Sequence, residues 1–415
     1  MIFNRFKFSG SPAKYRILSF LIPLFFFYMN ENMISLLFPL VSERIVNSAL
    51  LIGAIISGTT IISILCDFIF PQILKASNWK QQFVIGILIA ILLNTTLYHS
   101  LNTSDVYLLI LSGLLWSLYY EFCAFAVNNF LAVSEKGNNF SYDWGLISVV
   151  YNITSIIGPI LASFIANDFF VFLLGFELMA LIGIVFLGLI SPKAEEEVHK
   201  SKLKQTIDLM KELKIWELLI PKVLPLFVFS IVIGMIDSFY WTIGALFAED
   251  LFQREDLTFV PIVIYSIPFI FGGLIIAKIN LKKYKKKISQ LMLFIAGLVM
   301  SIFFFIDHNS IGSILLIIIS SLFLALAGPL NDAAYSNLLQ RLGKNMEHLV
   351  GIKKMSYSIA YLIGPVFAGF LGQFFGYGMS FGVLGIIAII VSLTLILTTP
   401  RKLILPQQEI VTITK

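Results

Sequence analysis

Long apolar runs separated by short polar stretches occupy the chain from residue 15 to residue 399. A helix needs about 20 predominantly apolar residues to cross the hydrocarbon core of a membrane. Six such runs precede a longer polar stretch and six follow it, near 15–41, 47–74, 82–101, 106–134, 142–167, 169–191, 221–248, 258–279, 286–306, 311–340, 349–373 and 375–399. The pattern predicts an all-α membrane protein with twelve transmembrane helices in two six-helix bundles.

The polar stretch at 192–220 separates an N-terminal bundle at 1–191 from a C-terminal bundle at 221–415. Apolar residues recur in this linker at roughly helical spacing among charged ones, which predicts an amphipathic helix lying on the membrane face. For the first part of the linker, a solvated tether is an equal alternative. The apolar positions are Ile207, Met210, Leu213, Ile215, Trp216 and Leu219.

Composition supports a membrane protein and argues against several other classes. Apolar residues make up 58% of the chain and charged residues 13%, about half the charged share of a soluble domain. The two cysteines and four histidines show no spacing for metal ligation, and no cofactor motif is evident. No nucleophile–base set or phosphate loop predicts an enzyme, and the charge pattern does not predict nucleic-acid binding. The first apolar run is too long for a cleavable signal peptide, so we interpret it as the first span.

The basic residues predict the orientation in the membrane. Of the 29 Lys and Arg residues, only Arg44 and Arg254 fall in loops on one side of the twelve-span topology. Cytoplasmic loops are the ones rich in Lys and Arg, so we expect both termini and the linker to be cytoplasmic. Frequent Ile, Phe, Asn and Lys are typical of an AT-rich microbial genome, which favours a bacterial cytoplasmic membrane. We expect a multi-pass monomer.

An internal repeat relates the two halves. Residues 144–166 align with 350–372 without gaps, and both segments contain a Gly-Pro pair, Gly158-Pro159 and Gly364-Pro365. The same offset pairs Glu31 with Asp237, which predicts two parallel halves of common design. Proline bends a helix, and small neighbouring residues let another helix approach closely. We therefore assign the Gly-Pro pairs a gating role between the halves, with a purely structural kink as the alternative.

Five acidic residues lie inside apolar runs, at Glu31, Glu121, Glu177, Asp237 and Asp332. An ionised carboxylate in mid-membrane costs at least about 2.5–3.5 kcal/mol. No Lys or Arg is expected at the same depth, so the partner would be a proton or a substrate. We predict proton coupling at Glu31, Asp237 and Glu121. Glu177 is expected to be structural, and Asp332 either binds substrate or reaches the interface.

Polar and aromatic residues near these acids are candidates for substrate binding. Aromatic faces attract cations, most strongly where water is excluded. Packing between helices is the alternative for each of them. The candidates are Tyr28, Asn32, Ser117, Tyr120, Asn128, Tyr240, Trp241, Asn331 and Asp332.

With these features, the chain resembles the major facilitator superfamily over essentially its whole length. Ser63 to Asp67 keeps the acid of that family's motif between spans 2 and 3, although Phe68 replaces the first arginine. The resemblance implies a gating role for Asp67, and Gly158-Pro159 resembles the motif associated with the family's antiporters. It also implies alternating access around a cavity lined by spans 1, 4, 7 and 10, the four spans that carry Glu31, Glu121, Asp237 and Asp332.

Three functional hypotheses follow. The first is a proton-coupled secondary transporter that exports cationic or amphipathic small molecules by antiport, since the expected cavity is acidic and aromatic. The second is a proton symporter importing a neutral polar solute such as a sugar, to which asparagine side chains would bond. The third is a non-transporting membrane sensor or partner protein. The expected partners are a small-molecule substrate, protons and the lipid bilayer.

Overall fold

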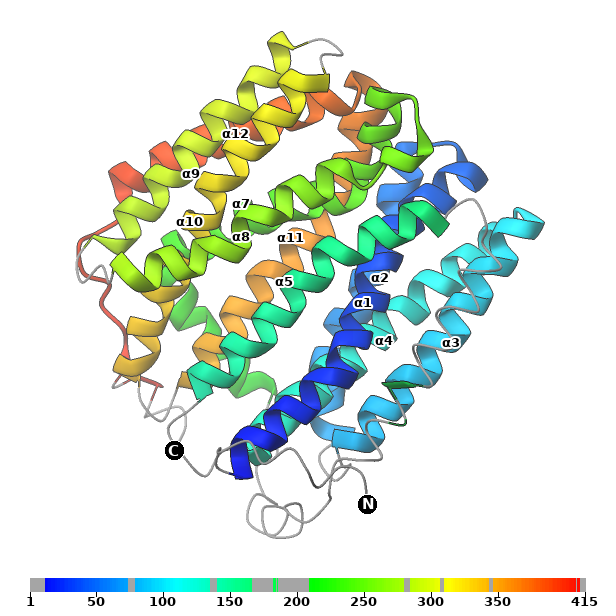
Figure 1. Cartoon of the computed structure of the whole chain (residues 1–415). Helices are drawn as coiled ribbons and strands as arrows, with labels where there is room; N and C mark the ends of the chain where they lie inside the picture. The colour runs from blue at the N-terminus through cyan, green and yellow to red at the C-terminus, as the bar shows by residue number, and fades with distance from the viewer. Residues whose placement is uncertain are drawn as a thin grey trace.

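The computed structural model describes residues 12–73, 79–134, 140–165, 182–183, 185, 209–279, 284–306, 310–342, 346–407 and 409–410. These residues form a bundle of long helices and no strand (Figure 1). The helices are α1 (Pro12–Val46), α2 (Ala49–Ile73), α3 (Trp79–Thr103), α4 (Val106–Ser134), α5 (Phe140–Ile165), α7 (Leu209–Phe252), α8 (Val260–Ile279), α9 (Lys285–Ser301), α10 (Ser310–Leu342), α11 (Met346–Phe375) and α12 (Tyr377–Thr398), with 3-10 turns η3 (Glu255–Leu257) and η4 (Ile302–Phe305).

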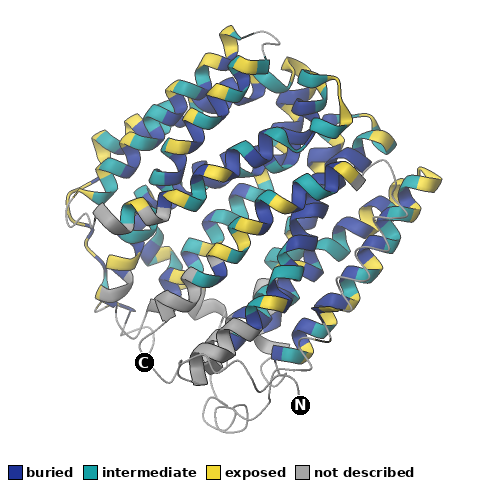
Figure 2. Ribbon diagram, viewed as in Figure 1, coloured by how far each residue is buried: buried dark blue, intermediate teal, exposed yellow. Residues whose placement is uncertain are grey.

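The all-α membrane class predicted from hydropathy is confirmed. Ten of the described helices contain a window long and apolar enough to cross a membrane, and α5 adds a shorter apolar stretch, Val149–Phe164. The predicted sixth span at 169–191 lies outside the described residues, apart from positions 182, 183 and 185. Burial places α1 and α7 at the centre, because 72% and 56% of their apolar windows are buried (Figure 2). These two helices carry Glu31 and Asp237.

Helix packing repeats between the halves at the offset seen in the sequence. Gly158 on α5 lies so close to α1 that an added Cβ would be 2.8 Å from the Cβ of Asn32. At the equivalent place in the other half, a Cβ on Gly364 of α11 would be 3.0 Å from the Cβ of Ser238 on α7. Residue 238 is the counterpart of residue 32. The two glycines therefore allow the same helix crossing in each half.

The linker differs from the sequence prediction over its described part. Residues 209–220 are the first turns of α7 and run directly into the span. Ile215 and Leu219 are buried in an apolar cluster that also contains Leu338 of α10 and Leu349 of α11. Ile215, Trp216 and Leu219 of the predicted stripe thus pack against protein rather than lying on lipid, whereas Leu213 is exposed. Residues 192–208 lie outside the described part of the chain.

The halves contact each other near the α1–α2 turn. The Ser48 hydroxyl beside that turn donates to Gln373 Oε1 at the end of α11, at 2.8 Å. The Ser57 hydroxyl oxygen accepts a bond from the backbone N–H of Val366 at 3.2 Å. An ion pair of 3.2 Å joins Arg44 to Glu255 at the same end. Helix α1 begins and α12 ends at the opposite end of the bundle. If the termini are cytoplasmic, as the basic residues predict, the end with the α1–α2 turn faces the outside of the cell. The contacts between the halves then close the bundle on that outer side.

Replacing Gly53 tests this closure. A Cβ at Gly53 on α2 would lie 2.1 Å from the backbone carbonyl oxygen of Pro365 on α11, whereas Gly58 on the same helix has open space. Overpacking of this kind costs about 1–3 kcal/mol, so Gly53→Ala should slow disulfide crosslinking of a Ser48→Cys/Gln373→Cys pair by about tenfold or more. Gly58→Ala, with the same gain in helix propensity, should crosslink at the parental rate. Equal rates in the two variants would contradict the close approach of α2 and α11.

Candidate central acidic site

Glu31 on α1 is held by one hydrogen bond. The indole Nε1 of Trp116 on α4 donates to Glu31 Oε1 at 3.0 Å. The other oxygen, Oε2, is buried and has no hydrogen-bond donor among the described residues. The side chain is almost fully enclosed, with 9% of the residue exposed. Buried polar atoms are normally hydrogen-bonded, so the unpartnered oxygen marks Glu31 as a functional candidate.

Asp237 on α7 has a partner for each oxygen. The Tyr265 hydroxyl on α8 donates to Oδ1 at 2.9 Å, and the Tyr361 hydroxyl on α11 donates to Oδ2. The backbone carbonyl of Tyr361 also accepts a bond from Thr60 on α2, at 3.2 Å. Tyr240, one turn along α7, is fully buried and stacks on Tyr265 with ring centroids 4.0 Å apart. Asp237 is therefore the junction of three helices in the C-terminal half.

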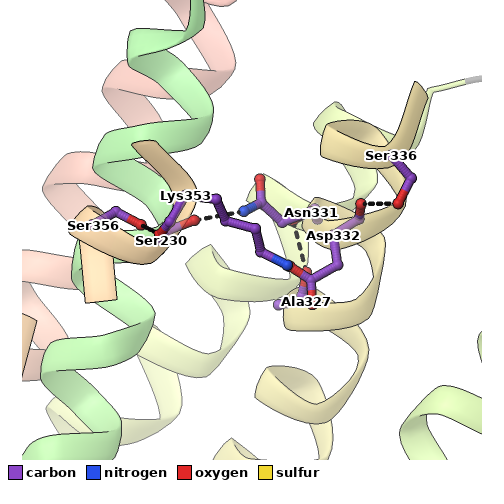
Figure 3. Close-up of polar contacts among 8 residues, drawn as sticks. Ser230, Ala327, Asn331, Asp332, Ser336, Lys353 and Ser356 are labelled. Atoms are coloured by element: carbon purple, nitrogen blue, oxygen red, sulfur yellow. Dashed lines mark hydrogen bonds and ion pairs between the residues drawn. The ribbon is translucent and has the colours of Figure 1, made fainter. Parts of the chain in front are cut away.

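Glu121 on α4 pairs with a lysine from the other half. Its residue is 2% exposed, and Lys354 Nζ on α11 lies 3.7 Å from Oε2. The neighbouring Lys353 makes a 2.6 Å ion pair with Asp332 on α10, within the C-terminal half (Figure 3). The prediction that no basic residue reaches the depth of these acids is wrong. Since α11 begins at Met346, both lysines lie about two turns inside the helix, and their long side chains span the remaining distance.

Glu31 and Asp237 share a neighbour, Tyr151. Tyr151 on α5 lies close enough to both carboxylates for electrostatic interaction. Its ring meets that of Tyr28 on α1 edge-on, with centroids 5.2 Å apart. Glu121 is likewise within electrostatic range of Glu31. The three predicted proton-coupling acids are thus linked in pairs, Asp237 and Glu31 through Tyr151 and Glu31 with Glu121 directly.

Several predicted substrate-binding residues instead join helices. Asn32 Nδ2 donates to the Tyr28 carbonyl at 2.7 Å and to Thr154 Oγ1 at 3.1 Å. The Ser117 hydroxyl donates to the Thr59 carbonyl at 2.7 Å. Asn331 Nδ2 donates to Ser230 Oγ at 2.9 Å (Figure 3). These hydrogen bonds fix α1 to α5, α4 to α2 and α10 to α7.

Other candidates remain accessible or lie outside the description. Tyr120, next to Glu121, is 41% exposed, and Trp241 is half-buried while packing against the apolar cluster of the N-terminal half. The side chains of Asp67 and Asn128 and the whole of Glu177 lie outside the described residues. The Pro365 carbonyl lies against Gly53 on α2 of the other half, whereas Gly158 and Gly364 pack within their own halves; the gating role of the Gly-Pro pairs stays a prediction.

Sequence reasoning missed the partners of the acids. Tyr265 and Tyr361 carry no charge, so nothing in the hydropathy pattern separates them from other tyrosines. Lys354 lies near the start of the predicted span at 349–373, and its charge fits the rule that links basic residues to cytoplasmic segments, so nothing in the sequence connected it with an acid. One signal was available for α11: Lys354 and Tyr361 are seven residues apart and so share a helix face.

Comparison with known proteins agrees with this architecture. The family model described as "Major Facilitator Superfamily" matches residues 20–346. The chain belongs to the major facilitator superfamily. It is therefore a multi-pass membrane transporter and not an enzyme. No curated protein sequence matches it.

Solved structures of the superfamily share the fold at low identity. The nucleoside transporter NupG is 13% identical, with 94% of this chain and 100% of that chain covered at a TM-score of 0.73. A POT family transporter crystallised with a thioalcohol-conjugated peptide is 12% identical, with 96% of each chain covered at 0.68. A bacterial homologue of the human lysosomal transporter Spinster, in an inward-facing conformation, is 11% identical, with coverage of 94% and 97% at 0.67. At these identities the likeness shows the fold alone.

A double-mutant cycle tests the ion pair between the halves. Lys354→Met should lower the melting temperature because it leaves the Glu121 carboxylate buried without its cation. Adding Glu121→Gln should recover part of that loss, with a coupling of about 1 kcal/mol, since the half-exposed lysine is partly screened by water. Thermal unfolding of the purified full chain measures both effects. Lys222→Met, at an exposed position on α7, controls for loss of a lysine, and strictly additive effects would contradict the pairing.

Proposed function

We propose that this chain is a proton-coupled secondary transporter for cationic or amphipathic small molecules, which it exports by antiport. The observation that carries the proposal is the central cluster of Glu31, Glu121 and Asp237, in which Glu121 already holds an amine, that of Lys354. A site that pairs a buried carboxylate with a half-exposed lysine suits exchange of its ammonium group for a cationic substrate. The aromatic rings around the acids favour the same ligand chemistry.

Glu31 is the proposed proton carrier. One Glu31 oxygen is bonded to Trp116 and the other is buried with no donor among the described residues, so the carboxyl group accepts a proton without losing a hydrogen bond. Asp237 differs because both of its oxygens already accept bonds from tyrosines. We therefore assign proton exchange to the N-terminal half and a positioning role to Asp237. Glu121 lies within electrostatic range of Glu31, so the charge of Glu121, and of any cation paired with it, acts on proton exchange at Glu31.

We propose that Lys354 occupies the Glu121 carboxylate when no cationic substrate is bound there. Its ammonium group is half exposed while its partner Glu121 is nearly fully buried, so a cationic solute can take its place at the carboxylate. Displacing Lys354 breaks a link between α4 and α11, which belong to opposite halves. Substrate binding at Glu121 therefore weakens one contact that holds the halves together on the side away from the closed α1–α2 turn. This couples occupancy to the rocking motion of alternating access.

Proton coupling is tested by neutralising Glu31. In proteoliposomes with an imposed pH gradient, we expect ethidium to move against its own gradient with the parent protein. Glu31→Gln should reduce this gradient-driven movement by at least about tenfold while ethidium exchange at equal pH continues. The matched control is Glu217→Gln, at an exposed glutamate on α7, which should behave as the parent. Undiminished uphill movement in Glu31→Gln would exclude Glu31 as the proton carrier.

A second candidate substrate class is an anionic or zwitterionic solute, which the half-exposed ammonium group of Lys354 would bind directly. The neutral-sugar symport hypothesis has less support, because three of its asparagine side chains already donate to other residues. Asn32, Asn129 and Asn331 bond to Thr154, Gln82 and Ser230 respectively.

Removing the lysine separates the two substrate classes. If the substrate is a cation, Lys354→Met removes a competitor and should lower the half-saturating ethidium concentration by about fivefold, the equivalent of about 1 kcal/mol. Glu121→Gln should raise it. If the substrate is an anion, Lys354→Met should instead abolish binding of carboxylate solutes. The half-saturating ethidium concentration should then be the same as in the parent. Unchanged ethidium affinity in both variants would refute the exchange of Lys354 for a cation.

A further inference from the structure

A second polar site lies outside the central region, in the C-terminal half. A cavity of about 380 Å³ opens where α9 begins and where α10 and α12 end. Cavities of this size hold small ligands or the polar part of larger ones. We call it the basic cavity; its lining residues with charged side chains are Lys285, Lys286, Lys287, Arg341, Arg401 and Lys402.

The charge of the basic cavity is unbalanced. Its lining includes no Asp or Glu, and none of its basic side chains makes an ion pair with a described residue. Two like charges 4 Å apart repel by about 1 kcal/mol even in water, and by more beside protein. Mutual repulsion of these basic side chains therefore destabilises the empty basic cavity, and a bound anion would reduce that repulsion.

The site is built rather than incidental. Lys286 Nζ donates to the carbonyl oxygens of Pro400 at 2.6 Å and Arg401 at 3.2 Å, which fixes the segment after α12 across the cavity. The first turn of α9 also borders the cavity, and its N-cap residue, Tyr284, makes no side-chain capping bond. A helix start without a cap presents free N–H groups and a positive partial charge. Both the backbone and the side chains thus offer donors to an anion.

Depth in the membrane favours a phosphate group. The apolar window of α9 begins at Lys285, and that of α12 ends at Thr398, directly before the lining residues Thr399 to Leu403. The basic cavity therefore lies where hydrocarbon gives way to the polar surface, the level of phospholipid phosphates. We propose that the basic cavity binds a phosphate-bearing anion, either the headgroup of an acidic phospholipid or a soluble phosphate compound.

A simpler account would treat these basic residues only as topology signals, which need positive charge near the cytoplasmic face but no concave site. The two accounts differ in one expectation: only a binding site makes the stabilisation by a phosphate-bearing anion depend on which lysines are removed. Lys287 and Lys402 are exposed and line the cavity, whereas Lys214 and Lys222 are exposed on α7 and do not. Two double variants with the same loss of charge can therefore be compared, Lys287→Gln/Lys402→Gln and Lys214→Gln/Lys222→Gln.

The test uses the purified, delipidated full chain. Melting temperature is measured during titration with phosphatidylglycerol, with phosphatidylcholine, and with inorganic phosphate against chloride at equal ionic strength. We expect phosphatidylglycerol, and not phosphatidylcholine, to raise the melting temperature of the parent and of the Lys214/Lys222 variant. The Lys287/Lys402 variant should need about 30-fold more phosphatidylglycerol, at about 1 kcal/mol for each lysine.

The phosphate arm distinguishes the source of the ligand. A saturable rise with inorganic phosphate, lost in the Lys287/Lys402 variant, identifies a soluble phosphate compound, whereas a rise with phosphatidylglycerol alone identifies the lipid. Retention of phosphatidylglycerol in native mass spectra gives a second readout that does not depend on unfolding. Equal responses of the two double variants to both anions, or no response in the parent, would overturn the proposal.

Discussion

The hydrocarbon interior of a membrane holds no water to hydrate a carboxylate, so each buried acid needs a partner from the protein, a proton or a ligand. The structure meets this need differently at each described acid. Trp116 bonds to Glu31, two tyrosines bond to Asp237, and lysines of α11 pair with Glu121 and Asp332. Each partner comes from another helix. The acids that are costly to bury therefore become the points at which helices are joined, and any change in their charge is felt by two or more helices at once.

The two halves repeat one architecture with different chemistry. Gly158 and Gly364 occupy equivalent helix crossings, and Glu31 and Asp237 occupy equivalent places on the central helices α1 and α7. Their surroundings are not equivalent: within the described part of the chain, one Glu31 oxygen has no donor, while both Asp237 oxygens accept bonds from tyrosines. Symmetric packing lets the halves rock as similar rigid bodies. The unequal hydrogen bonding leaves only one of the two positions suited to gain and lose a proton without loosening its helices.

Hydropathy predicted the spans because insertion in lipid depends on local composition, and the repeat at 144–166 and 350–372 predicted the equivalent halves. Side-chain direction was harder to predict. In a bilayer, both the lipid-facing and the protein-facing sides of a helix are apolar, so the sequence pattern does not set its rotation. Asn32, Ser117 and Asn331 were accordingly assigned to substrate, although they bond to neighbouring helices. Lys353 and Lys354 lie near the start of the predicted span at 349–373, but the sequence did not show that their side chains reach Asp332 and Glu121.

These two lysines show how a single helix can serve both halves. Consecutive residues on an α-helix point about 100° apart, so Lys353 reaches α10 in its own half while Lys354 reaches α4 in the other. A rocking motion that separates the halves must break the Lys354–Glu121 pair, but it leaves the Lys353–Asp332 pair intact. Only the first contact is therefore sensitive to conformation, and it involves the acid that a cationic solute would occupy. In the proposed mechanism, substrate binding at Glu121 is coupled to movement because the partner of Glu121, Lys354, belongs to the other half.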